Sequence, residues 1–181
     1  MTEQHKTQTV YGILLAVAIL WNLAFIAAPW SWAQGHTIVA TGLYLMFSPV
    51  CHQRADRSFF AFGHHLAVCH RCTGIYLGAL AGLLLVPLLS LARPGKREGL
   101  VRVRIQNRAL LLLALALMAA DVGGELLGIR HSTPMSRFLT GAFCGIVATF
   151  YLLPAIFDIF IKVSKESRPA VATDVSGIKI F

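Results

Sequence analysis

Long apolar stretches alternate with short polar segments along the whole chain. A membrane-spanning helix needs about 20 largely apolar residues to cross a hydrocarbon core of roughly 30 Å. Four stretches meet this requirement, at residues 10–32, 73–92, 109–129 and 138–161. A fifth stretch at 38–50 is too short to cross, and we expect an interfacial or re-entrant helix there, ended by Pro49. The pattern therefore predicts an all-α fold, a polytopic membrane four-helix bundle with one short extra helix.

The composition supports this class and excludes two others. Apolar and aromatic residues make up 56% of the 181 residues, and charged residues only 13%. A disordered chain needs the opposite balance, and a soluble domain this apolar would have too little polar surface to face water. We therefore predict a single transmembrane domain, residues 1–162, followed by a short flexible cytoplasmic tail, residues 163–181.

An alternative for the first stretch is a cleaved signal peptide, because Ser31-Trp32-Ala33 resembles a small-residue cleavage site. The stretch is long for such a peptide, and its leader has a single Lys. Trp30 and Trp32 also suit an aromatic belt at the membrane surface. We therefore expect a membrane span.

The basic link between the second and third spans predicts the orientation. Residues 93–108 hold six Lys or Arg residues against one acidic residue, Glu98. Because positively charged loops stay in the cytoplasm, this link and both termini would face inward, and segment 33–72 would face outward. We predict a multi-pass protein of the cell (inner) membrane with cytoplasmic N- and C-termini. The lipid bilayer is then its main partner, and no recognition motif suggests a nucleic-acid partner.

Cysteine and histidine gather in the outward segment just before the second span. Cys69 and Cys72 have the C-x-x-C spacing, which lets two sulfurs bind one metal ion or form a disulfide. Cys51 offers a third sulfur, and a nearby histidine would complete the tetrahedral set of three Cys and one His that zinc accepts. The histidines that could do so are His52, His64, His65 and His70. We predict zinc or another transition metal here. The candidate ligands are Cys51, His52, His65, Cys69 and Cys72.

Two other interpretations of this Cys/His-rich loop stay open. In one, Cys69 and Cys72 cycle between dithiol and disulfide, with quinone as the electron acceptor. In the other, they form a structural disulfide, and the histidines cap helices or face water. The outward side of a bacterial inner membrane is oxidising, which favours a disulfide. The odd number of outward cysteines leaves one thiol over, which favours a metal.

Two carboxylates lie inside the third span. Asp121 and Glu125 are four residues apart, so they share one helix face with Cβ atoms roughly 5–6 Å apart. Charges inside a membrane are costly and mark functional sites by default. Two adjacent acids further require a proton on one of them or a cation nearby. We expect Arg71 and Arg137 at the same outer depth, because they begin the second and fourth spans.

This convergence predicts either a working pocket or a structural bracket. As a pocket, Asp121 and Glu125 would be the catalytic acid and base. Three arginines would hold an anionic substrate, namely Arg54, Arg71 and Arg137. As a bracket, the same ion pairs would only hold the helices together.

Glycines repeat every four residues on two spans, at 74, 78 and 82 and at 141 and 145. Small residues at this spacing let helix backbones approach closely in membranes. The glycine faces therefore predict tight packing within the bundle or, alternatively, a homodimer. We expect the remaining cysteine, Cys144, to be a packing residue of the fourth span.

Four motifs fall within residues 45–150. They are Cys-His-Gln-x-x-x-Arg at 51–57, Cys-x-Arg-Cys-Thr-Gly-Ile-Tyr-x-Gly at 69–78, Asp121 with Gly128, and Arg-x-x-Thr-Gly-x-x-x-Gly at 137–145. The set resembles a family of small prokaryotic integral membrane proteins, domain of unknown function 2085. The resemblance implies a multi-span protein in which the Cys/His motif and the acid of the third span belong to one site, and it implies no activity.

A looser resemblance is to membrane thiol oxidoreductases that are four-helix bundles and use a quinone. They place a C-x-x-C at the outer end of a helix with an Arg nearby, as Cys69, Cys72 and Arg71 would be. Those proteins relay electrons through a further cysteine pair, whereas this chain offers only Cys51.

Three functions follow from these residues. The first is a metal-dependent enzyme acting on a lipid or small anionic substrate at the extracytoplasmic membrane boundary. The second is a membrane thiol–disulfide/quinone oxidoreductase. The third is a non-enzymatic metal-binding or transport subunit.

Overall fold

The fold was obtained as a computed structural model, which describes residues 3–91, 108–129 and 131–166. Four of its helices are long and apolar enough to cross a membrane. These helices are α1 (Glu3–Ala33), α3 (His70–Leu91), α4 (Arg108–Leu126) and α5 (Pro134–Glu166). The all-α, four-span prediction is therefore confirmed. The basic link at 92–107 and the end of the predicted tail, 167–181, lie outside the described residues.

Each long helix lies on the apolar stretch predicted for it, and the differences lie at the ends. Helix α4 ends at Leu126, three residues before the predicted end of its stretch at 129. Helix α1 begins before its apolar stretch, and α5 continues past the predicted end into the first residues of the predicted tail. A helix keeps its backbone hydrogen bonds after its side chains become polar, so apolarity alone does not mark its ends. The division at residue 162 stays a prediction.

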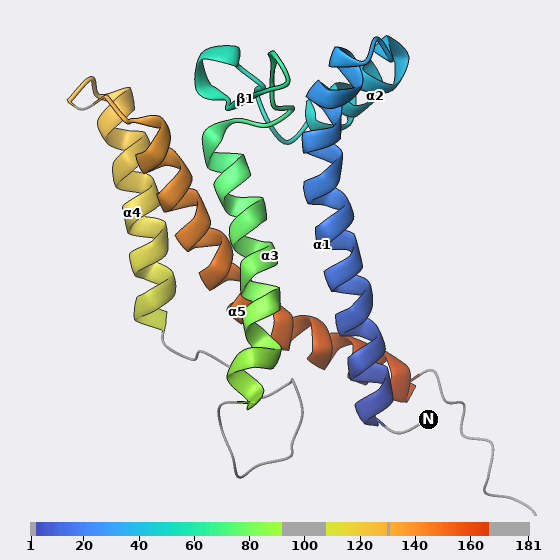
Figure 1. Ribbon diagram of the computed structural model, residues 1–181. Coiled ribbons are helices and arrows are strands. Elements are labelled where there is room, and N and C mark those ends of the chain that lie inside the picture. The colour runs from blue at the N-terminus through green and yellow to red at the C-terminus, as the bar shows by residue number, and fades with distance from the viewer. Residues whose placement is uncertain (1–2, 92–107, 130, 167–181) are drawn as a thin grey trace, which may run out of the picture.

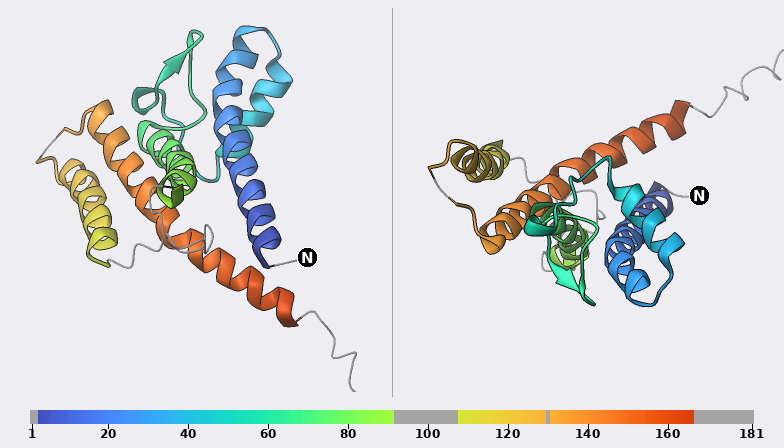
Figure 2. Two further views of the ribbon diagram at one scale, coloured as in Figure 1. Left: turned by 60° about the horizontal axis from the view of Figure 1, so that its bottom comes forward. Right: turned by 90° about the horizontal axis from the view of Figure 1, so that it is seen from above.

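The four long helices stand side by side in the order α4, α5, α3 and α1 (Figures 1 and 2). Helix α4 packs on the side of α5 that faces away from α1, and α5 crosses α3 in the middle of the bundle. The beginning of α1 and the end of α5 lie at one end of the bundle (Figure 1). We call the opposite end, where the α1–α3 connection lies, the loop end.

The glycine rows explain why α3 and α5 approach so closely. A Cβ atom at Gly78 would collide with the backbone of Ala142, and one at Gly145 would collide with the backbone around Ile75. Gly74 and Gly141 are equally restricted by the facing helix. The predicted packing within the bundle is therefore observed, with the glycine faces of one chain filled by its own helices. A homodimer through the same faces stays a prediction.

The connection between α1 and α3 covers the loop end with short elements. It contains helix α2 (Thr37–Phe47), the 3₁₀ turn η1 (Ala55–Arg57) and a hairpin of β1 (Phe60–Ala61) and β2 (His64–His65). Helix α2 has 11 residues and is the short helix predicted over 38–50, although it ends at Phe47, before Pro49. Whether it is interfacial or re-entrant stays a prediction.

The sequence analysis did not predict the hairpin. Its two turn residues, Phe62 and Gly63, have φ angles of 54° and 80°. Two left-handed residues in a row form the type of turn that joins short antiparallel strands, and Gly63 adopts this conformation without strain. Phe62 does so although bulky residues rarely adopt a positive φ. For this reason the turn could not be predicted from the sequence.

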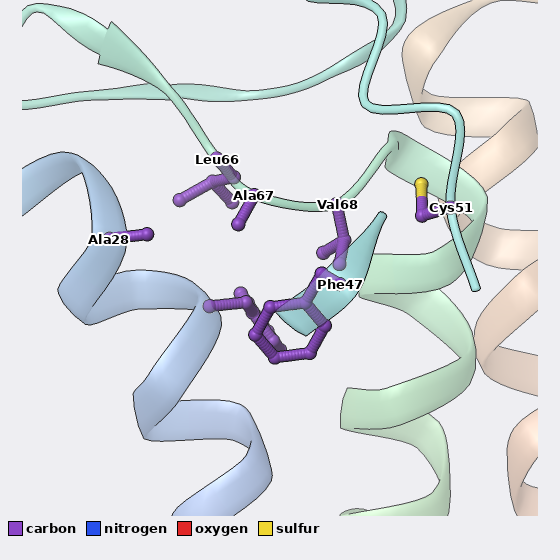
Figure 3. Packing of buried hydrophobic residues seen from close by; sticks show 7 residues of the cluster. Ala28, Phe47, Cys51, Leu66, Ala67 and Val68 are labelled. Atoms are coloured by element: carbon purple, nitrogen blue, oxygen red, sulfur yellow. The ribbon is translucent and has the colours of Figure 1, made fainter. Parts of the chain in front are cut away.

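An apolar core supports the connection from below. Phe47 of α2 and Val68 before α3 are fully buried against α1 residues such as Ala28 (Figure 3). Cys51 belongs to the same core and is 6% exposed. The core therefore fixes the position of one cysteine relative to the start of α3.

Candidate metal centre and ion-pair network

Three cysteines meet at the start of α3. The sulfur atoms of Cys51, Cys69 and Cys72 all lie within 4.8 Å of one another. Cys69 is the residue before α3 and Cys72 is in its first turn, so the C-x-x-C spacing puts both thiols on one side of the helix start. Cys51 reaches them from a segment 18 residues earlier. All three are free cysteines.

Backbone hydrogen bonds hold this arrangement. The Cys51 amide donates to the carbonyl of Phe47 at 3.0 Å, which continues the end of α2 into the site. The Cys69 amide donates to Cys51 Sγ at 3.1 Å. At the start of α3, the Thr73 amide and hydroxyl both donate to the Cys69 carbonyl, at 2.9 and 3.0 Å. The site is thus formed by the ends of two helices and by the core between them.

The three thiols share their protons unequally. Hydrogen bonds from Cys51 and Cys72 to the Cys69 sulfur hold the pKa of Cys69 far below its ordinary value. The same contact raises the pKa of the Cys51 thiol, because Cys51 is then the donor. A thiolate at Cys69 also lies at the positive end of the α3 dipole. The cluster therefore has one sulfur ready to bind a cation and two that lose a proton when they bind it.

The histidines lie outside this cluster. No nitrogen of His52, His64, His65 or His70 joins the group of close ligand atoms among the described residues. His52 is exposed, and His64 and His65 line a separate pocket. His70 is buried, with its ring 4.3 Å from that of Phe59. The structure brings together three of the five candidate ligands, and the contribution of His52 or His65 stays a prediction.

An ion-pair network begins one residue from the cysteines. Arg71 lies between Cys69 and Cys72 in the sequence, and its guanidinium donates to Asp121 Oδ2 from Nη2 at 2.7 Å and from Nε at 3.1 Å. The side chain of Asp121 is 4% exposed. Both guanidinium nitrogens donate to one carboxylate oxygen, and such charge-assisted hydrogen bonds are stronger than neutral ones. It links α3 to α4.

Glu125 forms ion pairs with three arginines. It accepts from Arg71 at 3.1 Å, from Arg137 of α5 at 2.8 Å and from Arg57 of η1 at 3.0 Å. Ser132 donates to the same carboxylate at 2.8 Å and accepts from Arg137 at 2.7 Å. One glutamate therefore connects α3, α4, α5 and the outer connection.

The two acids are fully engaged. Asp121 Oδ1 accepts from Ser136 at 3.2 Å, so each of the four carboxylate oxygens of Asp121 and Glu125 has a donor. Three guanidinium groups face two carboxylates, which supplies the cations that adjacent acids require. Asp121 and Glu125 thus meet Arg71 and Arg137 as expected from the sequence. Their catalytic and substrate-binding roles stay predictions.

Arg54 lies outside the ion-pair network, and Arg57 is part of it. Arg54 pairs with the exposed Asp56 at 3.1 Å and makes no ion pair with Asp121 or Glu125. Arg57 does reach Glu125, although only Arg54 was a candidate. The 3₁₀ turn decides which of the two points inward. Arg57 ends the Cys-His-Gln-x-x-x-Arg motif, so the motif carried a signal for this residue.

The chain matches the model of one protein family, and the matched residues include the site. The family model described as "Predicted membrane protein (DUF2085)" matches residues 51–151, which contain the three clustered cysteines and the network. An uncharacterized protein of Methanocaldococcus jannaschii is 36% identical over 157 residues, covering 84% of this chain and 96% of that protein. An uncharacterized protein of Methanothermobacter thermautotrophicus is 34% identical over 104 residues, covering 56% and 83%. None of the solved structures matches the chain.

Proposed function

The chain belongs to the DUF2085 family of predicted membrane proteins, and we propose that it holds a transition metal ion, zinc by its ligand chemistry, on Cys51, Cys69 and Cys72. The observation that carries the proposal is the convergence of three thiols from two segments within 4.8 Å. The two cysteines of a C-x-x-C at a helix start lie close together by local geometry alone. The third is brought there by the packing of α2 and the core.

The spacing of the sulfurs fits one ion. Zinc binds thiolates at about 2.3 Å, so two sulfurs of a tetrahedral site lie roughly 3.8 Å apart. The observed limit of 4.8 Å requires only a small inward movement of the thiols. Soft thiolates select zinc, copper(I) or iron over magnesium or calcium. Binding would replace the hydrogen bonds that the three thiols now share.

The number of ligands favours a catalytic metal site over a structural one. Structural zinc sites are closed by four protein ligands, whereas catalytic sites have three and leave one position to water or substrate. Three sulfurs without a histidine nitrogen beside them, among the described residues, match the second pattern. We therefore propose a metal-dependent enzyme, with the ion as Lewis acid toward a bound oxygen.

The ion-pair network supports a lipid or small anionic substrate. Glu125 occupies three guanidinium groups, and a phosphate or carboxylate head group offers them the same oxygen geometry. Such a group would bind by displacing Glu125 from Arg57 or Arg137 and would free the glutamate as a base. Asp121 would then hold Arg71 in place beside the metal.

The proposed location is the outer boundary of the cell (inner) membrane, with cytoplasmic termini. The beginning of α1 and the end of α5 lie at one end of the bundle, and the connection between α1 and α3, which leads through Cys51 and Cys69 to the start of α3, lies at the other (Figure 1). The basic link 93–108 assigns the first of these ends to the cytoplasm. A lipid substrate could then enter from the outer leaflet.

Metal analysis of the purified full chain tests the proposal. We expect close to one zinc, copper or iron ion per wild-type chain and a large loss in Cys69→Ser. Cys144→Ser is the matched control, because Cys144 lies on α5 outside the cluster and its loss should leave the metal content unchanged. A metal-free wild type, or equal metal in Cys69→Ser, would overturn the proposal.

A second candidate is the thiol–disulfide oxidoreductase with quinone as the electron acceptor. The observation that favours it is the lowered pKa of Cys69, the property of a reactive thiol at a helix start. It requires a metal-free protein in which quinone changes the thiol count by two per chain. A third outcome, bound metal with cellular function intact in Asp121→Asn and Glu125→Gln, would identify a non-enzymatic metal-binding or transport subunit.

A further inference from the structure

A pocket separate from the cysteines opens at the loop end. It has a volume of about 400 Å³, and it lies between α1, α2 and the β hairpin. Its lining is mostly apolar. The lining residues are Trp32, Thr41, Tyr44, Leu45, Gln53, His64 and His65. The volume is within the range of small-molecule sites, and neither the metal proposal nor the ion-pair network uses this pocket.

Aromatic rings form its walls. The ring of Trp32 lies 6.2 Å from that of Tyr44 and 6.0 Å from that of His64, and the ring of Tyr44 lies 5.2 Å from that of His65. The Tyr44 hydroxyl donates to the His65 carbonyl, which ties α2 to the hairpin. Walls of this kind fit a planar ring, since aromatic faces and edges pack favourably.

Two polar groups of the pocket, Gln53 and His65, are fixed as acceptors by the hydrogen bonds that they donate elsewhere. Gln53 donates both hydrogens of its amide nitrogen, to the carbonyls of Tyr44 at 2.7 Å and Ala67 at 2.8 Å. Carbonyls only accept, so this assignment leaves the amide oxygen for other partners. His65 Nδ1 lies 3.0 Å from the Leu66 carbonyl and must therefore donate to it. In the neutral imidazole, the other nitrogen is then an acceptor.

Within the described part of the chain, the lining contains no Asp, Glu, Lys or Arg, so it gives a charged head group no carboxylate, ammonium or guanidinium partner. The surface around it is apolar, because Ile38 and Leu45 of α2 are 89% and 64% exposed. In a membrane protein such side chains face lipid or its boundary with water. A ligand of this pocket is therefore neutral and reaches it from the bilayer.

We infer that this pocket binds a lipid-soluble hydroxylated aromatic ring, a hydroquinone, with its hydroxyl groups donating to Gln53 and His65. The oxidised ring of the same molecule has carbonyl oxygens instead of hydroxyls, so it cannot donate to Gln53 or His65. The donors of the lining, on Trp32 and Thr41, can serve the oxygens of either form. One neutral hydrogen bond corresponds to about a fivefold change in affinity. The reduced form therefore binds about fivefold or more tightly than the oxidised form.

The test compares two probes that differ only in these hydrogens, decylubiquinol and decylubiquinone. Their binding to the purified full chain in lipid nanodiscs is measured anaerobically by calorimetry, with binding to empty nanodiscs subtracted. Wild type should bind the quinol about fivefold or more tightly. Equal affinity for the two probes, a preference for the quinone, or no binding of either would overturn the inference.

Variants locate the site. His65→Phe keeps a ring but removes the acceptor, and Thr41→Trp fills the pocket; each should weaken quinol binding at least fivefold. His36→Phe is the matched control, because His36 is exposed at the loop end and outside the pocket. Thermal unfolding identifies any variant that fails to fold. If both folded pocket variants bind the quinol like wild type, the inference fails, and the metal proposal is unaffected.

Discussion

Arg71 Nη2 lies 2.7 Å from Asp121 Oδ2, and Arg71 lies in the first turn of α3 between Cys69, just before the helix, and Cys72. A single helical turn thus belongs both to the candidate metal centre and to the ion-pair network. We therefore expect a change at either site to shift this turn and to affect the other site. The following predictions rest on that connection and on the packing beneath it.

Removing the charge of Arg71 should strongly destabilise the protein. Arg71→Gln leaves the buried Asp121 without its cation, which costs about 3–5 kcal/mol for a buried pair. Arg54→Gln removes an exposed pair with Asp56 and should cost about 1 kcal/mol or less. Unfolding of both variants in mixed micelles measures the difference. A similar loss of unfolding free energy in the two variants would show that the buried pair stabilises the protein no more than the exposed pair does.

Glu125→Gln should loosen the outer connection. Glu125 is the partner that holds Arg57 of η1, whereas Asp121 binds only Arg71 among the described arginines. Hydrogen exchange of segment 54–66 should therefore become faster in Glu125→Gln and stay near the wild-type rate in Asp121→Asn. Faster exchange in both variants, or in neither, would contradict this division of roles.

Gly78→Ala should weaken the contact between α3 and α5. The added Cβ would collide with the backbone of Ala142, so the helices must separate, at a cost of about 1–3 kcal/mol. Gly123→Ala is the control, because nothing lies within 4 Å of a Cβ there. Alanine also favours a helix interior, so this control should be neutral or more stable by up to about 1 kcal/mol. The unfolding free energies of these two variants are compared in the same assay. A Gly78→Ala variant as stable as wild type would rule out close packing at this glycine.

The orientation predicts which side of the membrane holds the C-terminus. A green fluorescent protein fused there should fluoresce, and an alkaline phosphatase fused there should be inactive, because both termini are expected in the cytoplasm. The opposite pattern would turn the cysteines toward the cytoplasm. The proposed outer-leaflet substrate would then be wrong.

The sequence predicted the helices well and, in part, which candidate side chains lie together, for physical reasons. Spans follow from continuous apolarity, which depends on composition and hardly on tertiary contacts. The meeting of Asp121 and Glu125 with Arg71 and Arg137 followed from depth alone, because helix rise converts sequence position into depth. These acids and arginines therefore lie where the topology put them.

The outer connection could not be predicted in the same way. Its backbone has no single period, so a 3₁₀ turn decided that Arg57 and not Arg54 points at Glu125. A left-handed Phe62 produced a hairpin that propensity would not suggest. That hairpin carries His64 and His65 to a pocket of their own. Residue type showed that these side chains could bind a metal, while tertiary packing decides which of them lie together.

The central claim is that three thiols bind one metal ion, and X-ray absorption at the metal edge tests it most directly. The spectrum of the purified wild-type chain should show three sulfur neighbours at about 2.3 Å and one lighter neighbour. Cys51→Ser should lose one sulfur neighbour, and Cys144→Ser should give the wild-type spectrum. A wild-type sample without a metal edge, or with a shell of nitrogen and oxygen alone, would contradict the account.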